Sequence, residues 1–422
     1  AKADVEITLI DRTNHHLFQP LLYQVATAGL SAPAISGPIR HILRKEMQRG
    51  HLTILLGEVT RIDSVQRSVE LDGGKDQIPY DHLIVAAGAT HSYFGHDDWA
   101  QHAPGLKTLA DAFTIRRRVL LAFERAERKH DARASMTCLT FAVVGAGPTG
   151  VEMAGMMAEI AHHTLPDEYR HIDSRKARVL LIEGGPRVLS AFSEELSAKA
   201  RSQLDALGVE VHLNAKVSNI DAEGLDYDGP DGPVRIDTKT IVWAAGVAAS
   251  PLGRSLAASS GCETDRAGRV VVEPDLSVPG HPEISVVGDL AAALSHPRKG
   301  APSPVPGVSP GAKQMGRHAA KNLLRRLRGE PTEPFRYIDY GALATIGRHS
   351  AIAAVDVPVL GKIQFSGSLA WLFWLFVHIY FLIGFRNRLV VLSDWAWAYF
   401  SFERQARVVA DPETPTPSKA VR

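Results

Sequence analysis

The feature that most constrains this chain is a glycine-rich turn at residues 145–150, Gly-Ala-Gly-Pro-Thr-Gly, which follows the apolar run 141–144. The three glycines have separable roles. Gly145 permits a tight strand-to-helix turn, Gly147 lets a pyrophosphate approach the backbone, and Gly150 lets the following helix pack on the strand. The N–H groups of that helix would point at the phosphates. In this context the turn predicts a dinucleotide-binding site.

An acidic residue after the next apolar run favours one nicotinamide dinucleotide over the other. Glu183 follows residues 179–182, farther from the glycine turn than the usual spacing of about 20 residues. An insertion at about 162–176 accounts for the excess. A carboxylate at this position accepts hydrogen bonds from ribose hydroxyls and repels a 2′-phosphate. The sequence therefore favours NADH over NADPH.

A second, partial fingerprint lies at the start of the chain. Residues 5–11 form an apolar run that ends in Asp11, as in the second strand of a βαβ unit whose acid binds an adenosine ribose. The glycine turn that should precede it is missing, and Ala1 is not an initiator Met. We therefore expect the chain to begin inside a longer natural sequence. Asp289, at the end of a later apolar run, is the type of acid that two-dinucleotide flavoproteins place beside the flavin.

Apolar runs bounded by glycine alternate with stretches of helical spacing, which predicts a doubly wound α/β fold. The expected helices span 110–128, 151–161 and 194–207, the last with Ser193 as its N-cap. The expected strands are residues 83–88, 141–145, 179–183, 241–246 and 284–289. A length of 422 residues allows two or three domains, and a net charge of +1 gives no case for nucleic acid.

No metal site or redox dithiol is predicted. Cys138 and Cys262 lie far apart and form no CxxC motif, so both are interpreted as small buried hydrophobic residues. The paired histidines at 15–16 and 162–163 lack metal-ligand spacing with other candidates.

The C-terminal region is predicted to contact a membrane. Residues 369–385 are apolar except for His378, and Arg386 and Arg388 follow at once. This run is at the lower edge of the roughly 17–25 residues that a transmembrane helix needs. Aromatic residues occur throughout it, so we expect it to lie on the membrane surface, with a single span less favoured and a buried core or dimer helix as the alternative. The Pro- and Gly-rich stretch at 297–311 is expected to be a loop, and the end from Pro412 to be disordered.

Taken together, several strings resemble those of type II NADH:quinone oxidoreductases. They are Asn-His-His-Leu-Phe-Gln-Pro-Leu-Leu-Tyr-Gln-Val-Ala at 14–26, the Gly145 to Glu152 motif, Val-Gly-Asp at 287–289, and Leu-Ala-Thr-Ile-Gly-Arg at 343–348. The resemblance covers the chain from residue 5 to about 404. It implies a single-subunit, non-pumping enzyme of the respiratory chain that uses FAD and passes two electrons from NADH to a membrane quinone, ubiquinone or menaquinone. It also implies monotopic attachment to the cytoplasmic face of the inner membrane, and it leaves a homodimer open.

The resemblance implies two Rossmann-like domains, with the NADH domain inserted in the FAD domain. The expected segments are 1–112 and 259–334 for FAD, 113–258 for NADH, 335–410 for the membrane-binding region, and 411–422 for a disordered tail. With the glycine turn for FAD missing upstream of Ala1, flavin retention is expected to be poor.

The same resemblance assigns cofactor roles to individual residues. The FAD site would contain Asp11, Val59, Ala87, Gly88 and Asp289. The NADH site would contain Gly145, Gly147, Pro148, Gly150 and Glu183, with the loop at Ala245 and Gly246 close to both cofactors. Glu152 resembles the acid placed near the nicotinamide; the alternative is a glutamate that only interacts with the helix dipole.

A quinone motif of the family, AQxAxQ, is only partly kept. Its first two positions are Ser309 and Pro310 here, followed by Gly311 and Ala312, and its last glutamine is Gln314. Small residues would admit a flat ring, and the Gln314 amide would bond a quinone carbonyl. The alternative is that Gln314 is an ordinary amide on the helix surface, with no role in quinone binding.

Other functions compete with this one. A sulfide:quinone-type flavoprotein shares the architecture but needs cysteines beside the flavin, and neither Cys138 nor Cys262 is well placed. A dithiol reductase lacks its paired-cysteine motif. A flavin-less, membrane-associated NAD(H)-binding protein is the alternative supported by the missing glycine turn.

Overall fold

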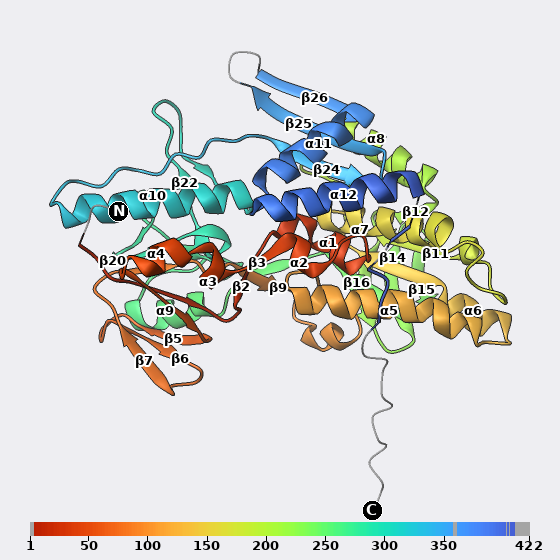
Figure 1. The fold of residues 1–422 in the computed structure, drawn as a ribbon, viewed down its shortest axis with the longest axis horizontal. Helices are drawn as coiled ribbons and strands as arrows, with labels where there is room; N and C mark the ends of the chain where they lie inside the picture. The colour runs from red at the N-terminus through yellow and green to blue at the C-terminus, as the bar shows by residue number, and fades with distance from the viewer. Residues whose placement is uncertain (1–3, 358–360, 402, 405, 410–422) are drawn as a thin grey trace, which may run out of the picture. The chain divides into compact units, whose positions relative to one another are not determined.

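The computed structural model describes residues 4–357, 361–401, 403–404 and 406–409, which form two compact units (Figure 1). Each unit has an apolar core of its own. The first unit is Ala1–His16, Gly37–Ser92 and Val247–Tyr340, and the second is Leu17–Ser36, Tyr93–Gly246 and Gly341–Arg422. The predicted domain boundaries at residues 112, 258 and 334 remain predictions.

Parallel strand pairs in the first unit end at or before three of the predicted flavin residues. Strand β1 (Ile7–Asp11) pairs in parallel with β4 (Leu52–Leu56). Strand β8 (Leu83–Val85) pairs in parallel with β20 (His281–Val286), which also pairs with β19 (Ser277–Val278) in the antiparallel sense. The strands predicted at 83–88 and 284–289 are therefore confirmed, with shorter hydrogen-bonded segments.

Three predicted flavin residues lie at or after the carboxyl ends of these strands. Asp11 is the last residue of β1, Gly88 follows β8, and Asp289 lies in the 3₁₀ turn η5 (Gly288–Leu290) that follows β20. Open α/β sheets bind ligands beyond the carboxyl ends of their strands. The other elements of this unit are α3 (Ile39–Ile42), α4 (Arg44–Gln48), β5 (Val59–Asp63), β6 (Ser68–Leu71), β7 (Asp76–Pro79), β9 (Ala89–His91), β17 (Val247–Ala249), α9 (Leu252–Ser260), β18 (Val270–Val271), β21 (Ala291–Ala292), β22 (Leu294–Ser295), β23 (Ser303–Pro304) and α10 (Ser309–Leu327). Two of the unit boundaries fall within β2 (His15–Leu17) and β3 (Ser36–Pro38).

A four-stranded parallel sheet is the centre of the second unit. Its order is β12 (Val209–His212), β11 (Arg178–Ile182), β10 (Thr140–Val144) and β16 (Thr240–Trp243). All five residues of β10 are buried, as expected for a parallel strand covered on both faces. The apolar runs predicted as strands at 141–145, 179–183 and 241–246 are confirmed.

Helices with recognisable caps surround this sheet. Helix α5 (Leu109–Glu127) begins with a capping box in which the Thr108 side chain accepts a hydrogen bond from the Asp111 N–H. Helix α8 (Glu194–Ala206) has Ser193 as its N-cap, as predicted. Helix α7 (Pro148–Glu159) follows the glycine turn and continues as the π turn η3 (Ile160–Thr164). The remaining elements are η1 (Gln19–Leu21), α1 (Leu22–Ala26), α2 (Ala32–Ile35), η2 (Asp97–Gln101), α6 (Ala132–Cys138), η4 (Ser174–Lys176), β13 (Lys216–Ile220), β14 (Gly224–Gly229) and β15 (Gly232–Asp237).

The C-terminal part of the second unit is a three-stranded meander followed by two helices. The strands are β24 (Ala342–Ile346), β25 (Ser350–Val357) and β26 (Gly361–Gly367), and the helices are α11 (Ser368–Phe381) and α12 (Phe385–Ser401). The apolar run at 369–385 is thus not one continuous helix. Helix α11 ends at Phe381; the next residue, Leu382, is extended, and Gly384 takes a positive φ of 84°. Across the part of the chain that the structure describes, no helix has the length and hydrophobicity to cross a membrane.

One predicted loop is partly wrong. Helix α10 already begins at Ser309, so the last residues of the stretch expected as a loop at 297–311 are helical. Pro310 lies in the first turn, where its missing N–H has no intrahelical partner to lose. The tail expected to be disordered from Pro412 lies outside the described residues.

Candidate functional site

The glycine turn between β10 and α7 is closed by steric contacts that only glycine permits. Gly145 has a φ of +98°, and a Cβ on it would lie 2.6 Å from the Ala245 Cα. A Cβ on Gly150 would lie 1.8 Å from the Gly145 carbonyl oxygen. A Cβ on Gly147, by contrast, would meet no atom within 4 Å. The turn is therefore packed at its first and third glycines and open at its second, where a pyrophosphate would approach.

The N-terminus of α7 leaves its first N–H groups available to a ligand. Gly147 is the N-cap and provides no side-chain cap, and Pro148 follows in the first turn. Helix N-termini with free N–H groups and a positive dipole end bind phosphate. The geometry of this turn fits the pyrophosphate of a dinucleotide.

Glu183, the residue after β11, hydrogen-bonds to the backbone of the glycine turn. Its Oε2 accepts a hydrogen bond from the Ala146 N–H at 2.6 Å, and its Oε1 accepts one from the Gly185 N–H at 2.8 Å. Each carboxylate oxygen keeps a lone pair after these bonds. The half-buried carboxylate is thus oriented by two backbone groups and is still able to accept hydrogen bonds from ribose hydroxyls.

Glu152 lies further along α7 with only 8% of its surface exposed. Burial raises the pKa of its carboxyl to about 8, and a backbone hydrogen bond from Thr345 opposes part of that rise. A carboxyl group with a pKa in this range exchanges a proton near neutral pH. This burial also weakens the alternative in which Glu152 only interacts with the helix dipole at the surface.

The two predicted flavin acids of the first unit, Asp11 and Asp289, differ in how many hydrogen bonds their carboxylate oxygens accept. Asp11 Oδ1 accepts hydrogen bonds from the N–H and the hydroxyl of Thr13, at 2.7 and 2.9 Å. Within the described part of the chain, the Asp289 carboxylate has no hydrogen bond or ion pair, and a Cβ on Gly307 would lie 3.5 Å from its Oδ1. Gly88 takes a φ of +65° with open space where a Cβ would point. An unpaired carboxylate and an open glycine fit the approach of a hydroxylated cofactor.

The other predicted cofactor residues occupy strand ends or turns. Val59 begins β5, and Ala87 is exposed between β8 and Gly88. In the second unit, Ala245 and Gly246 follow β16 and are half-buried. These positions neither support nor oppose the roles that the resemblance implies.

The predicted quinone residues lie at the start of α10, beside the turn that carries Asp289. A Cβ on Gly288 would lie 3.4 Å from the Ala312 Cβ, which places η5 against this end of α10. Gly311 is tightly packed, since an added Cβ would lie 3.1 Å from the Pro306 carbonyl oxygen. The structure therefore brings a predicted flavin acid and the predicted quinone residues together within one unit.

Gln314 has a structural role that the sequence did not reveal. Its Nε2 donates a hydrogen bond to the Ile338 carbonyl and its Oε1 accepts one from the Ile338 N–H, both at 2.9 Å. The amide thus ties α10 to the segment before β24. One Nε2 hydrogen remains for a quinone carbonyl, so the two roles are compatible.

A buried polar cluster at the end of α7 is not predicted by the sequence. It comprises Glu159, Arg348, Arg404 and Tyr23, of which Glu159, Arg404 and Tyr23 are at most 5% exposed. Tyr23 and Arg348 lie in two of the strings that carried the family resemblance, which was the available signal. Their spacing in sequence gives no indication that they meet.

The C-terminal helices present an apolar surface. Helices α11 and α12 carry large apolar side chains that are 39–83% exposed, and we call these the apolar face. Its members are Leu369, Leu372, Phe376, Tyr380, Phe381, Phe385, Leu389, Leu392, Trp397, Tyr399 and Phe400. His378, on α11, is half-buried, and desolvation lowers its pKa to about 4, so this histidine is neutral at pH 7.

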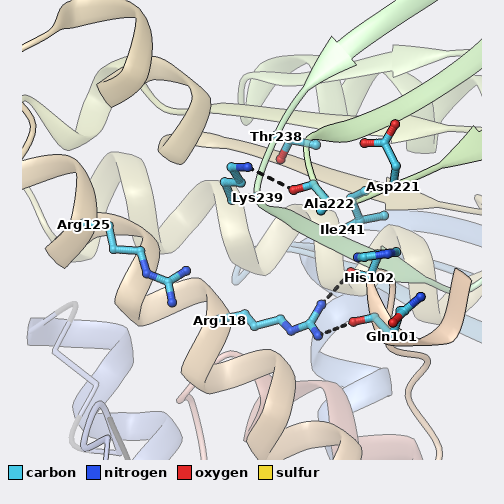
Figure 2. A pocket seen from close by; sticks show the side chains of 9 residues that line it. All are labelled: Gln101, His102, Arg118, Arg125, Asp221, Ala222, Thr238, Lys239 and Ile241. Atoms are coloured by element: carbon cyan, nitrogen blue, oxygen red, sulfur yellow. Dashed lines mark hydrogen bonds between the residues drawn. The ribbon is translucent and has the colours of Figure 1, made fainter. Parts of the chain in front are cut away.

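A polar pocket of about 210 Å³ lies elsewhere in the second unit (Figure 2). Figure 2 shows Arg118 extending from α5. Its guanidinium donates hydrogen bonds to the backbone carbonyls of His102 and Gln101. The pocket is lined by Gln101, His102, Arg118, Arg125, Asp221, Ala222, Thr238, Lys239 and Ile241. None of these nine residues is among the predicted site residues.

Comparison with known proteins first gives the class that this fold and glycine turn define. Residues 1–316 match the family model described as pyridine nucleotide-disulphide oxidoreductase, and residues 340–405 match the NDH2 C-terminal domain. The α/β fold predicted from the sequence is confirmed by these matches.

Relatives then identify the family. The chain is 48% identical over 418 residues to the type II NADH:quinone oxidoreductase Ndh of Mycobacterium tuberculosis, covering 98% of this chain and 87% of the relative. It is 47% identical over 414 residues to NdhA of the same organism, with 96% and 84% covered. The chain belongs to the type II NADH:quinone oxidoreductases, which are FAD-dependent enzymes.

Solved structures support the same architecture. The structure of NDH2 from Plasmodium falciparum in complex with NADH matches with a TM-score of 0.83 and 20% identity, covering 95% of this chain and 94% of that one. The sulfide:quinone oxidoreductase from Aquifex aeolicus matches with a TM-score of 0.70 and 18% identity, covering 94% and 90%. At these identities the likeness shows the fold alone. The family assignment therefore favours the NADH:quinone function over the sulfide:quinone alternative.

Proposed function

We propose that this chain oxidises NADH at the turn 145–150, reduces a membrane quinone beside α10, and works from the cytoplasmic face of the inner membrane. The observation that carries the proposal is the glycine turn. It is packed at Gly145 and Gly150, open at Gly147, and followed by a helix N-terminus without a side-chain cap. This is the arrangement that a dinucleotide pyrophosphate requires.

The second unit would bind and orient NADH. The N–H groups at the start of α7 hold the pyrophosphate, and Glu183 accepts hydrogen bonds from the adenosine ribose while its charge disfavours a 2′-phosphate. Glu152, with its raised pKa, holds a proton on its buried carboxyl close to neutral pH. Its placement near the nicotinamide is the part of this assignment that rests on the family resemblance.

The first unit would hold FAD and receive the quinone. Asp11 and Asp289 offer carboxylate oxygens to cofactor hydroxyls, and Gly88 offers open space at the end of β8. Bound FAD supplies the two-electron chemistry between nicotinamide and quinone. At the start of α10, Pro310 and Gly311 are small, and Gln314 keeps one N–H for a quinone carbonyl.

The apolar face of α11 and α12 would attach the protein to the membrane without crossing it. Its exposed aromatic and aliphatic side chains are grouped on two consecutive helices, and grouped exposed apolar residues are typical of membrane-binding surfaces. A lipid surface is the proposed partner, and a homodimer is the competing use of the same face. Arg386 and Arg388, at the start of α12, carry positive charge toward anionic head groups.

A visible spectrum tests the proposed function. The purified chain is loaded with FAD under anaerobic conditions, NADH is added, and a soluble quinone follows. Bleaching of the flavin band by NADH and its return with the quinone are the expected results. A flavin band that NADH leaves unchanged, while the protein still binds NADH, contradicts the proposal. Bleaching by sulfide but not by NADH would support the sulfide:quinone alternative instead.

A further inference from the structure

Helix α10 carries basic side chains and no acidic ones. It contains Lys313, Arg317, Lys321, Arg325 and Arg326, but no Asp or Glu. The whole chain has 47 basic and 46 acidic residues, so this excess of positive charge belongs to the helix and does not follow from the composition.

Three of these bases lie along one exposed side of the helix. Lys313, Arg317 and Lys321 follow one another at intervals of four residues, which places them on one face, and all three are exposed. We call these three residues the basic stripe. The residues of the opposite side are buried, and they are Gly311, Met315, Ala319 and Asn322. The basic stripe therefore points away from the core that holds the helix.

The charges of the basic stripe are not offset within the helix. Helix α8 places an acid four residues from a base, as in the Lys199–Glu195 pair at 2.7 Å. In the part of the chain that the structure describes, Arg317 and Lys321 have neither an ion pair nor a side-chain hydrogen bond. Like charges four residues apart on a helix repel each other and destabilise it. An anionic partner along this side of α10 would relieve that repulsion.

Acids close to α10 are paired with the other bases of the helix. Arg326 pairs with Asp275 at 2.6 Å. Arg325 lies 3.2 Å from Glu333 and 3.9 Å from Glu330. None of these pairs involves the basic stripe, so they leave its positive charge in place.

The basic stripe begins beside the predicted quinone residues. Lys313 precedes Gln314, whose side chain is hydrogen-bonded to the Ile338 backbone at 2.9 Å. Large apolar side chains are exposed at this end of the helix: Val308 is 42% exposed, Ile338 59% and Tyr340 57%. Basic residues next to exposed aliphatic and aromatic residues are typical of surfaces that lie on an anionic membrane. A membrane quinone arrives from the lipid, so a surface beside its entry would face lipid too.

We propose that the basic stripe, with the exposed Val308 and Ile338, is a second membrane-contact surface that binds the head groups of anionic phospholipids. This inference rests on the proposed function in placing the quinone at the start of α10. The surface belongs to the first unit, whereas the apolar face belongs to the second. It binds through charge, and the apolar face binds through inserted apolar side chains, so the two respond differently to lipid composition.

Vesicle binding tests the proposal without NADH or quinone. The purified chain is titrated with phosphatidylcholine vesicles that contain or lack phosphatidylglycerol, and the bound fraction is measured by sedimentation. Each basic side chain near an anionic surface strengthens binding about fivefold, so Arg317→Gln/Lys321→Gln should bind phosphatidylglycerol-containing vesicles about 25-fold more weakly than the parent. Its binding to pure phosphatidylcholine vesicles should stay unchanged.

Two double variants serve as matched controls. Arg44→Gln/Lys45→Gln removes the same two residue types from exposed positions on α4 in the same unit, and it should bind anionic vesicles within about twofold of the parent. Arg317→Lys/Lys321→Arg keeps both charges and should bind as the parent does. Equal losses in the α4 and α10 glutamine variants would show that only net charge matters, which overturns the proposal.

An unchanged affinity of Arg317→Gln/Lys321→Gln for anionic vesicles also overturns the proposal. If this variant is in addition no longer retained by immobilised polyglutamate, which retains the parent, the basic stripe binds an acidic protein and not a membrane.

The proposed function fails separately. Arg317→Gln/Lys321→Gln should reduce a soluble quinone at the rate of the parent chain, because neither residue is placed in the cofactor or quinone sites. If the parent itself passes no electrons from NADH to a soluble quinone, the proposed function is wrong, and the vesicle titrations still decide whether the basic stripe binds anionic lipid.

Discussion

Glu183 accepts a hydrogen bond from the Ala146 N–H at 2.6 Å, so the acid that follows β11 also orients the glycine turn after β10. The second oxygen of the same carboxylate is held by Gly185 at 2.8 Å. One side chain thus connects the phosphate-binding turn to the expected ribose-binding position. Substitutions at Glu183 should therefore separate its charge from its bracing role.

Glu183→Gln removes the charge but keeps one carbonyl oxygen for the Ala146 N–H. The preference for NADH over NADPH, measured as the ratio of kcat/KM values, is expected to fall about tenfold, the effect of about 1.4 kcal/mol of lost repulsion. Glu183→Ala should relax the preference too and also weaken binding of both nucleotides, since the turn loses its brace. Glu194→Gln, at a side chain that is 94% exposed, is the control. An unchanged ratio in both Glu183 variants would refute the assignment.

Gly147→Ala and Gly150→Ala should have different effects: the first should weaken NADH binding, and the second should destabilise the fold. The Cβ at position 150 would lie 1.8 Å from the Gly145 oxygen, so this variant is expected to lose about 3 kcal/mol or more of unfolding free energy through backbone strain. The Cβ at position 147 meets no protein atom within 4 Å, so stability should change by less than about 0.5 kcal/mol. The NADH affinity of Gly147→Ala should nevertheless decrease, because the added methyl group occupies the space through which the pyrophosphate approaches. Urea unfolding and NADH titration distinguish the two effects, and equal NADH affinity in Gly147→Ala and the parent would contradict the phosphate role.

Glu152 should make stability depend on pH. Its pKa is about 8 in the folded chain against an ordinary 4.5, so between these values the folded state binds more protons than the unfolded state. The contribution of this group to the free energy of unfolding is fully present below about pH 4.5 and is lost as the pH rises through 8. The free energy of unfolding falls by at most about 1.4 kcal/mol per pH unit in this range. Glu152→Gln cannot ionise and should lose less unfolding free energy than the parent between about pH 5 and pH 9. Equal slopes for the two proteins would show that the carboxyl is not buried as described.

Polar substitutions on the apolar face should weaken membrane binding without unfolding the protein. Phe376, Phe385 and Phe400 are 64%, 76% and 83% exposed, so changing all three to serine should alter the unfolding free energy little. Each aromatic ring inserted in a bilayer contributes about 1.5–3 kcal/mol, so sedimentation with phosphatidylglycerol-containing vesicles should weaken at least tenfold. Val65→Ser, at a residue that is 75% exposed in the first unit, serves as the control. If vesicle binding persists while a dimer dissociates, the apolar face is a subunit interface.

Local patterns predicted the strands and helices of the second unit well. The apolar run at the end of β10 and the Ser193 cap of α8 depend on neighbours in sequence, so both can be predicted before the fold is known. The apolar run at 369–385 was different. Its composition predicts contact with a membrane, and this stays a prediction. Leu382 and Gly384 break the run into two helices, which a hydropathy average over the run does not reveal.

The sequence alone was enough to predict a dinucleotide-binding turn and an acid that would favour NADH, and to identify the family. These depend on short strings whose chemistry is local, such as Gly145 to Gly150 followed by Glu183. The fold was needed to show that Glu159 pairs with Arg404 and that Gln314 is hydrogen-bonded to Ile338. Glu159 and Arg404 lie 245 positions apart, and the pairing of buried charges is set by which elements pack together, not by spacing along the chain.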